Sequence, residues 1–156
     1  MNLSFKIKTV LSSLLLFVSI SLAAQDQSVA NPEWGNLKKS LSARVVLIQQ
    51  LTLELQKSEA IDRVDAKTTQ VKSEALQSLL KKSEVLTPEI KTTNRDMTQS
   101  FTRLLVQMEQ DPMLKANQDF GRSVKELNQF EEKFTSVVKA YNDECTKMKR
   151  EDLRFE

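Results

Sequence analysis

Apolar residues recur at alternating three- and four-residue steps along most of the chain, and this spacing predicts α-helices that each bury one face. Two glycines and three prolines in 156 residues are too few for the turns of a β protein. Three segments carry the pattern most clearly: Trp34, Leu37, Leu41, Arg44, Ile48, Leu51 and Leu55; Ile90, Asn94, Met97, Phe101, Leu104 and Met108; and Phe120, Val124, Leu127, Glu131, Phe134, Val138, Tyr141, Cys145 and Met148.

The prolines indicate where helices begin, because each follows a residue whose side chain can cap a helix: Asn31-Pro32, Thr87-Pro88 and Asp111-Pro112. Helices are therefore predicted over residues 32–57, 59–86, 88–110 and 118–150, with a short turn over 111–117. Short connections make consecutive helices antiparallel neighbours. The predicted fold is all-α: an antiparallel up-down-up-down four-helix bundle at 32–150, followed by a tail at 151–156.

Residues 1–24 have the features of a signal peptide. Lys6 and Lys8 precede an apolar run from Val10 to Leu22, and Ala23-Ala24 supplies the small residues of a cleavage site. An uncleaved membrane anchor is the alternative, but the run is shorter than the ~20 residues that a spanning helix needs. The sequence thus predicts an exported protein, periplasmic or secreted, with a short linker at 25–31; the alternative is a membrane-anchored one.

Cleavage would leave a chain with little net charge. Lys6 and Lys8 are lost with the signal, so 21 of the 23 basic residues remain against 21 acidic ones. This balance gives no reason to expect nucleic acid as a partner. Cys145 is the single cysteine, which excludes an intramolecular disulfide, and its place on a helical stripe predicts a core position.

The residue types also argue against catalysis. The sequence contains no histidine, which removes the commonest general base and most zinc sites. Iron sites in helical bundles use Glu-x-x-His motifs, which are likewise missing, and the glycines are too few for a phosphate-binding loop. We therefore predict no catalytic, cofactor-binding or metal-binding residues, no enzyme activity and no small-molecule substrate.

Two charges interrupt the stripes, Arg44 in the first predicted helix and Glu131 in the last. Each lies 13 residues from the end that these helices share in an up-down-up-down bundle, which is ~20 Å at the helical rise. The sequence therefore predicts a largely buried ion pair that aligns the two helices. The alternative is that one of the two charges reaches water along its flexible stem.

The last predicted helix is longer than its neighbours, ~50 Å against ~39 Å for the first at the helical rise. The projecting end would carry Met148, Leu153 and Phe155. It is expected either to fold back on the segment before Trp34 or to offer these side chains as an apolar docking patch.

Several of these residues resemble the LemA family of bacterial helical proteins. The most specific match is Glu109 to Asn117 leading to Phe120, which is similar to the family's E-x-Y-P-x-L-K-A-N loop. Further matches are Trp34, Arg44, Leu47, Ile48, Leu51, Arg103, Leu104, Leu105, Leu127, Glu131, Tyr141 and Asn142. The resemblance implies a four-helix bundle tethered to the cell envelope, without established enzymatic activity. Asp111 in place of an aromatic departs from the pattern, and so does the interruption at Asn31-Pro32, which favours a cleaved form.

The expected function is that of a non-catalytic exported protein of the cell envelope, acting as a helical scaffold or protein-interaction module. Its expected partner is an envelope protein of unknown identity. The alternative is the same bundle attached to the membrane through an uncleaved N-terminal helix.

Overall fold

The computed structural model describes residues 31–59 and 61–156, and within them the chain is all-helical, with no strand. The predicted fold class is confirmed to that extent. The α-helices are α2 (Trp34–Leu55), α3 (Arg63–Lys82), α4 (Pro88–Gln110), α5 (Pro112–Ala116) and α6 (Gln118–Lys147), and a 3-10 helix, η1 (Glu151–Leu153), follows. Residues 31–156 form one compact unit, which includes the predicted tail.

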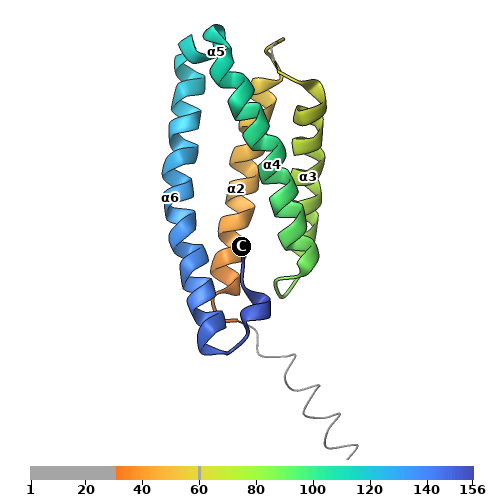
Figure 1. Ribbon diagram of the computed structural model, residues 1–156, viewed down its shortest axis with the longest axis vertical. Helices are drawn as coiled ribbons and strands as arrows, with labels where there is room; N and C mark the ends of the chain where they lie inside the picture. The colour runs from red at the N-terminus through yellow and green to blue at the C-terminus, as the bar shows by residue number, and fades with distance from the viewer. Residues whose placement is uncertain (1–30, 60) are drawn as a thin grey trace, which may run out of the picture. The chain divides into compact units, whose positions relative to one another are not determined.

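The long helices pack as a bundle in which consecutive ones run in opposite directions (Figure 1). Helix α3 packs most extensively on α4, while α2 lies against both α3 and α6. Helices α4 and α6 are connected through α5 at one end and diverge toward the other, where the C-terminal segment lies between them (Figure 1). Helix α2 therefore contacts each of the other three long helices.

The buried interior is a single apolar cluster contributed by every α-helix and by the C-terminal segment. Its fully buried members include Leu37, Leu41, Ile48, Met97 and Leu104, all on the predicted stripes. Burial of a leucine or isoleucine side chain contributes about 1.5–3 kcal/mol, so this cluster supplies the main driving force for folding.

Helix α4 has the predicted bounds, whereas α3 is shorter than predicted. Thr87 caps α4 by accepting a hydrogen bond from the Ile90 amide, as its Thr-Pro sequence predicts. Helix α3 begins at Arg63 instead of residue 59 because the Asp62 carboxylate accepts from the amides of Val64 and Asp65. It ends at Lys82, four residues before the predicted end.

Helix α2 begins at Trp34, two residues later than predicted. As its Asn-Pro sequence predicts, the Asn31 side-chain oxygen accepts from the Glu33 amide at 2.8 Å, while its side-chain nitrogen donates to the Tyr141 carbonyl oxygen at 3.1 Å and to the Cys145 sulfur at 3.2 Å. The Asn31 side chain therefore both caps the turn that leads into α2 and contacts the end of α6. The helix also ends at Leu55 instead of residue 57.

The segment 111–117 was predicted as a turn, but it contains the short helix α5. Asp111 ends α4 and caps α5 by accepting from the amides of Met113 and Leu114. Asn117 in turn caps α6 through the amides of Asp119 and Phe120. Two consecutive caps thus reverse the chain within seven residues.

Helix α6 ends at Lys147, three residues before the predicted end. Lys149 has a φ of 56°, and the amides of Lys149 and Arg150 donate to the carbonyls of Thr146 and Cys145. This is the Schellman arrangement, in which a left-handed residue closes a helix. It turns the chain back so that residues 150–156 return along the bundle (Figure 1).

The signal peptide predicted at 1–24 and all but Asn31 of the linker lie outside the described residues. In the part that the structure does describe, none of the helices is long and apolar enough to cross a membrane.

Candidate interaction site and the polar contacts between helices

The structure brings Arg44 and Glu131 together, with Arg44 Nε 2.6 Å from Glu131 Oε1. The guanidinium also donates from Nη1 to Asn94 Oδ1 at 3.1 Å and to Thr98 Oγ1 at 2.9 Å. Its Cζ lies 5.5 Å from the centre of the Phe134 ring, within range of a cation–π contact. One arginine on α2 therefore joins α4 and α6.

The pair is only half buried, although a largely buried pair was predicted. The Arg44 side chain is 9% exposed and that of Glu131 is 35% exposed. The Glu131 side chain therefore remains in contact with water, whereas the Arg44 side chain is almost fully enclosed. The partners on α4 were missed from the sequence, where Asn94 appeared only as a polar residue on the apolar stripe.

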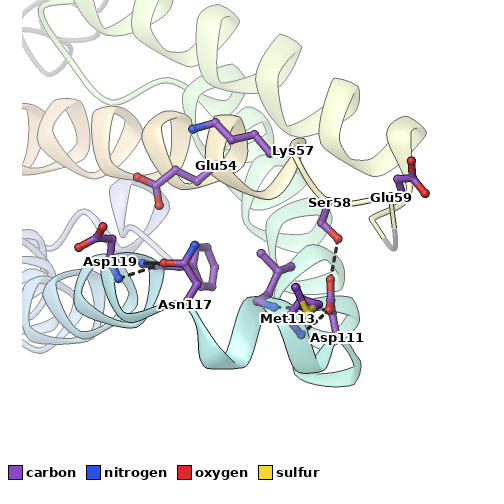
Figure 2. Close-up of a pocket in the computed structure, with 10 residues that line it drawn as sticks. Glu54, Lys57, Ser58, Glu59, Asp111, Met113, Asn117 and Asp119 are labelled. Carbon is purple, nitrogen blue, oxygen red and sulfur yellow. Dashed lines mark hydrogen bonds between the residues drawn. The ribbon is translucent and has the colours of Figure 1, made fainter.

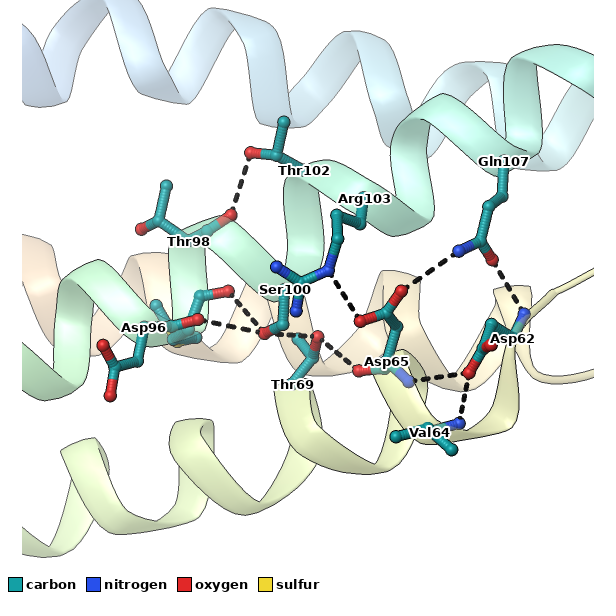
Figure 3. A network of polar contacts seen from close by, with 11 residues as sticks. Asp62, Val64, Asp65, Thr69, Asp96, Thr98, Ser100, Thr102, Arg103 and Gln107 are labelled. Carbon is teal, nitrogen blue, oxygen red and sulfur yellow. Dashed lines mark hydrogen bonds and ion pairs between the residues drawn. The ribbon is translucent and has the colours of Figure 1, made fainter.

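A second set of polar contacts joins α3 to α4 (Figure 3). Arg103 Nε donates to Asp65 Oδ1 at 2.7 Å, and Gln107 donates to Asp65 Oδ2 while accepting from the Asp62 amide. Deeper in this interface Thr69 donates to Ser100 Oγ at 2.9 Å, and both side chains are fully buried. These contacts align α3 with α4 at two places: at the start of α3 through Asp62 and Asp65, and in the buried interface through the hydroxyls of Thr69 and Ser100.

The three residues of the predicted docking patch do not form one exposed surface. Phe155 is buried, at 4% exposure, with its ring centre 6.0 Å from that of Phe134 in an edge-to-face arrangement. Met148 and Leu153 are partly buried. The C-terminal segment therefore folds back, the other outcome considered for it, but onto α6 and α4 instead of the segment before Trp34.

Asn142 holds this segment by its backbone. Its side-chain nitrogen donates to the Phe155 carbonyl at 2.8 Å, and its oxygen accepts from the Phe155 amide at 2.8 Å. Lys91 of α4 donates to the carbonyl of Arg154 at 2.7 Å. The side chain of Phe155 fills the space where α4 and α6 diverge because these three bonds fix its main chain.

Cys145 lies in the core, fully buried, beside Asn31 and Tyr141. The pKa of Tyr141 is raised above its ordinary value, first by burial and then by the neighbouring Cys145. Trp34 packs edge-to-face on Tyr141 with ring centres 6.4 Å apart. The junction between the start of α2 and the end of α6 is thus apolar, apart from the Asn31 amide.

The candidate interaction site is a hollow of about 720 Å³ at the α5 end of the bundle (Figure 2). Glu54, near the end of α2, faces Asn117 and Asp119 at the start of α6, and Lys57, just after α2, also lines the hollow. Its full lining is Glu54, Lys57, Ser58, Glu59, Asp111, Met113, Leu114, Asn117, Asp119 and Phe120. Four acidic residues and one lysine give the hollow an excess of negative charge.

The floor of this hollow is firmly held, while its rim is exposed. Ser58 donates to Asp111 Oδ2 at 2.6 Å, and this bond, followed by those from the amides of Met113 and Leu114, lowers the pKa of the Asp111 carboxyl. Met113 on the rim is 83% exposed, a large value for an apolar side chain. No local sequence pattern predicts this hollow, because it depends on α5, and the segment that forms α5 was predicted as a turn.

In the described part of the chain, no group of three or more histidine, cysteine, aspartate or glutamate residues is placed to hold a metal ion. The acidic side chains around the hollow include one, Asp111, that already accepts three hydrogen bonds. The geometry therefore offers a surface for a basic or apolar group more readily than a set of ligands for a cation.

Comparison with known proteins matches residues 33–155 to the sequence model of the LemA family. No curated protein and no solved structure matches the chain. The matched range covers every helix of the described structure.

Proposed function

The chain belongs to the LemA family, and on that premise we propose that it is a non-catalytic, exported protein of the cell envelope that acts as a helical scaffold and binds a partner protein. We interpret its fold as an up-down-up-down four-helix bundle in which α5 is a one-turn insertion between α4 and α6. The alternating direction of the long helices supports this interpretation (Figure 1).

One observation carries the proposal: inward polar side chains on α2 and α3 bond one helix to another. Arg44 of α2 bonds to Asn94 and Thr98 of α4 and to Glu131 of α6. Thr69 of α3 bonds to Ser100 of α4. Polar groups used in this way fix helix alignment and are not free to act on a substrate. This use of polar residues is what a scaffold requires.

The hollow at the α5 end is the surface that we propose for the partner. It combines an exposed apolar side chain, Met113, with the carboxylates of Glu54, Glu59 and Asp119. A partner segment with a basic residue beside an apolar one would meet both features. The partner is proposed to be another protein of the envelope.

A photo-crosslinking residue placed at Met113 tests this surface in living cells. We expect a crosslinked product that is lost when Glu59 and Asp119 are both replaced by lysine. The matched control is the same crosslinker at Val85, which is 47% exposed and lies between α3 and α4 at the other end of the bundle. Equal products at both positions, or a product at Met113 that survives the charge reversal, would contradict the proposal.

Export is tested separately, by intact mass and N-terminal sequencing of the protein from native cells. A mature chain that begins at Ala24 or Gln25 in the soluble fraction is the expected result. The alternative function, a bundle serving an envelope complex through an uncleaved N-terminal helix, predicts that Met1 is retained and that the protein remains with the membranes.

A further inference from the structure

The outer face of α3 carries small and β-branched side chains at heptad spacing. Val64 and Val71 are 73% and 52% exposed. We call these two residues, together with Thr68, Ala75 and Ser78, the outer stripe, because they follow one another at steps of four and three residues. The opposite face of α3 is buried in the bundle through Ala66, Thr69, Ser73, Leu76 and Leu80. Helix α3 thus has the pattern of a helix that packs on two sides.

Charged residues flank the outer stripe on both sides. On one flank Lys67 and Glu74 are exposed, and neither takes part in any ion pair between described residues. On the other flank Asp65 and Lys72 pair with Arg103 and Asp96 of α4, at 2.7 and 2.8 Å. The side turned away from α4 therefore carries Lys67 and Glu74, seven residues apart, with Lys81 one heptad further along the same flank.

We infer that the outer stripe is a self-association surface, on which α3 of a second copy of this chain packs antiparallel. In the symmetric register that fits the stripe, Val64 packs on Ala75 of the second copy and Thr68 packs on Val71 of the second copy. That register places Lys67 opposite Glu74 of the second copy, and Asp65 opposite its Lys72. Symmetry doubles each of these contacts, so four complementary pairs surround the apolar seam. The inference does not depend on the proposed partner at the α5 end.

The charges select this arrangement over its neighbours. In a parallel pair Lys67 would flank Lys72 of the second copy, which brings like charges together on both sides of the seam. An antiparallel pair shifted by one heptad in one direction would place Lys72 opposite Lys72 of the second copy, and Glu74 opposite its Glu74. A shift by one heptad in the other direction would place Asp65 opposite Asp65 of the second copy, and Lys67 opposite its Lys67. Among these four arrangements, the unshifted antiparallel register is the one that brings no like charges together.

The expected dimer is weak and reversible. One pair of helices covers less surface than the ~1,200–2,000 Å² of standard stable interfaces. The seam also contains threonine, alanine and serine beside the two valines. Association is therefore expected to depend on protein concentration and to weaken as salt screens the flanking charges.

Charge reversal with complementation tests the inference by analytical ultracentrifugation of the protein as isolated from the producing cells. Lys67→Glu and Glu74→Lys should each raise the dimer dissociation constant about tenfold or more, since each changes two attractions into two repulsions. Mixing the two variants should restore association, because every flanking pair on that side is then complementary again. The Lys67→Glu/Glu74→Lys double variant should also associate, because its pairs on that side are complementary with the signs exchanged. Lys133→Glu, an exposed reversal on α6, is the control and should leave the constant unchanged.

Disulfide crosslinking tests the register. A mixture of Thr68→Cys and Val71→Cys proteins should form the mixed disulfide, whereas a parallel pair would give each cysteine bonded to its own copy. Cys145 is fully buried and does not compete. Val71→Asp should abolish association, while Val106→Asp, at an equal 52% exposure on α4, should not.

Three results would overturn the inference. They are a wild-type protein that stays monomeric at millimolar concentration, single variants that do not complement each other, and disulfides that join like positions. Crosslinks from position 71 to residues 25–30 of the same chain would show that the N-terminal segment covers the stripe instead, and would overturn it equally.

Discussion

Arg44 Nε lies 2.6 Å from Glu131 Oε1, and the two side chains differ in exposure, 9% for the arginine and 35% for the glutamate. The arginine also has two neutral acceptors on α4, whereas the glutamate can be hydrated. The two ends of the pair therefore contribute to stability in different ways, because loss of the glutamate leaves a buried cation and loss of the arginine leaves a carboxylate that can turn to water.

We predict that Glu131→Ala lowers the free energy of unfolding by about 2–3 kcal/mol and Arg44→Met by about 1–2 kcal/mol. The double variant should be close to Arg44→Met alone, since no buried charge is then left without a partner. Urea denaturation at neutral pH, followed by circular dichroism, measures all three. Glu132→Ala, at the exposed neighbouring position, is the control, and strictly additive effects of the two substitutions would rule out the coupling.

Phe155→Ala should lower the free energy of unfolding by about 2–4 kcal/mol, because it empties the space that the ring fills between α4 and α6. Arg154→Ala removes a side chain that is 49% exposed and should have little effect. Thermal and urea unfolding of the two variants give the comparison. Equal stability of both variants would mean that the C-terminal segment contributes nothing to the core.

Asn142→Ala should release the C-terminal segment without removing its ring. Both bonds to the Phe155 backbone are lost, and we expect a loss of stability of about 1–2 kcal/mol. Hydrogen exchange should show the Phe155 amide becoming unprotected while amides in the middle of α4 and α6 keep their protection. Retained protection at Phe155 would show that packing alone holds the segment.

Lys149→Gly should stabilise the protein by about 0.5–1 kcal/mol. Lys149 occupies the left-handed region at a φ of 56°, where glycine has no steric cost and is the residue most often found at a helix end. The same substitution at Lys139, an exposed position inside α6, should destabilise by about 1 kcal/mol. Opposite signs at the two positions in a thermal unfolding experiment are the expected result, and a loss at both would contradict the role of the left-handed turn.

Ser58→Ala should make the protein less stable at neutral pH, and the difference from the wild type should shrink as the pH falls. The Ser58 hydroxyl is the first cause that lowers the pKa of Asp111 in the folded protein. A lowered pKa contributes stability that is present above the ordinary value of 3.8 and is lost as the pH falls through the folded value. Urea midpoints from neutral pH down to acid measure this, and a difference that stays constant over the range would exclude the linkage.

The sequence predicted most closely the elements whose signals are local. Helix α4 has the predicted bounds because Thr87-Pro88 starts it and Asp111 ends it, both through contacts within a few residues. The buried faces of α2, α4 and α6 could likewise be predicted from the sequence, since helical spacing depends only on neighbouring turns. The alignment of Arg44 with Glu131 followed from counting residues along two such helices.

The failures arose where distant residues decide local structure. Asn31 accepts from the Glu33 amide as a cap would, but its side-chain nitrogen also bonds to the end of α6, more than a hundred residues away, and no local pattern predicts that contact. The burial of Phe155 depends on Phe134 and Asn142 in the same way. The hollow at the α5 end was missed because Asp111 both ends one helix and begins the next, a double role that spacing alone does not reveal.

Trp34 is the single tryptophan of the chain, and it stands in the apolar junction against Tyr141 with an indole nitrogen that has no hydrogen-bond partner among the described residues. Its fluorescence is therefore a natural optical probe of one end of the molecule. A shift of its emission to longer wavelength at constant helix content would signal that this junction has opened while the rest of the molecule stays folded, without any attached dye.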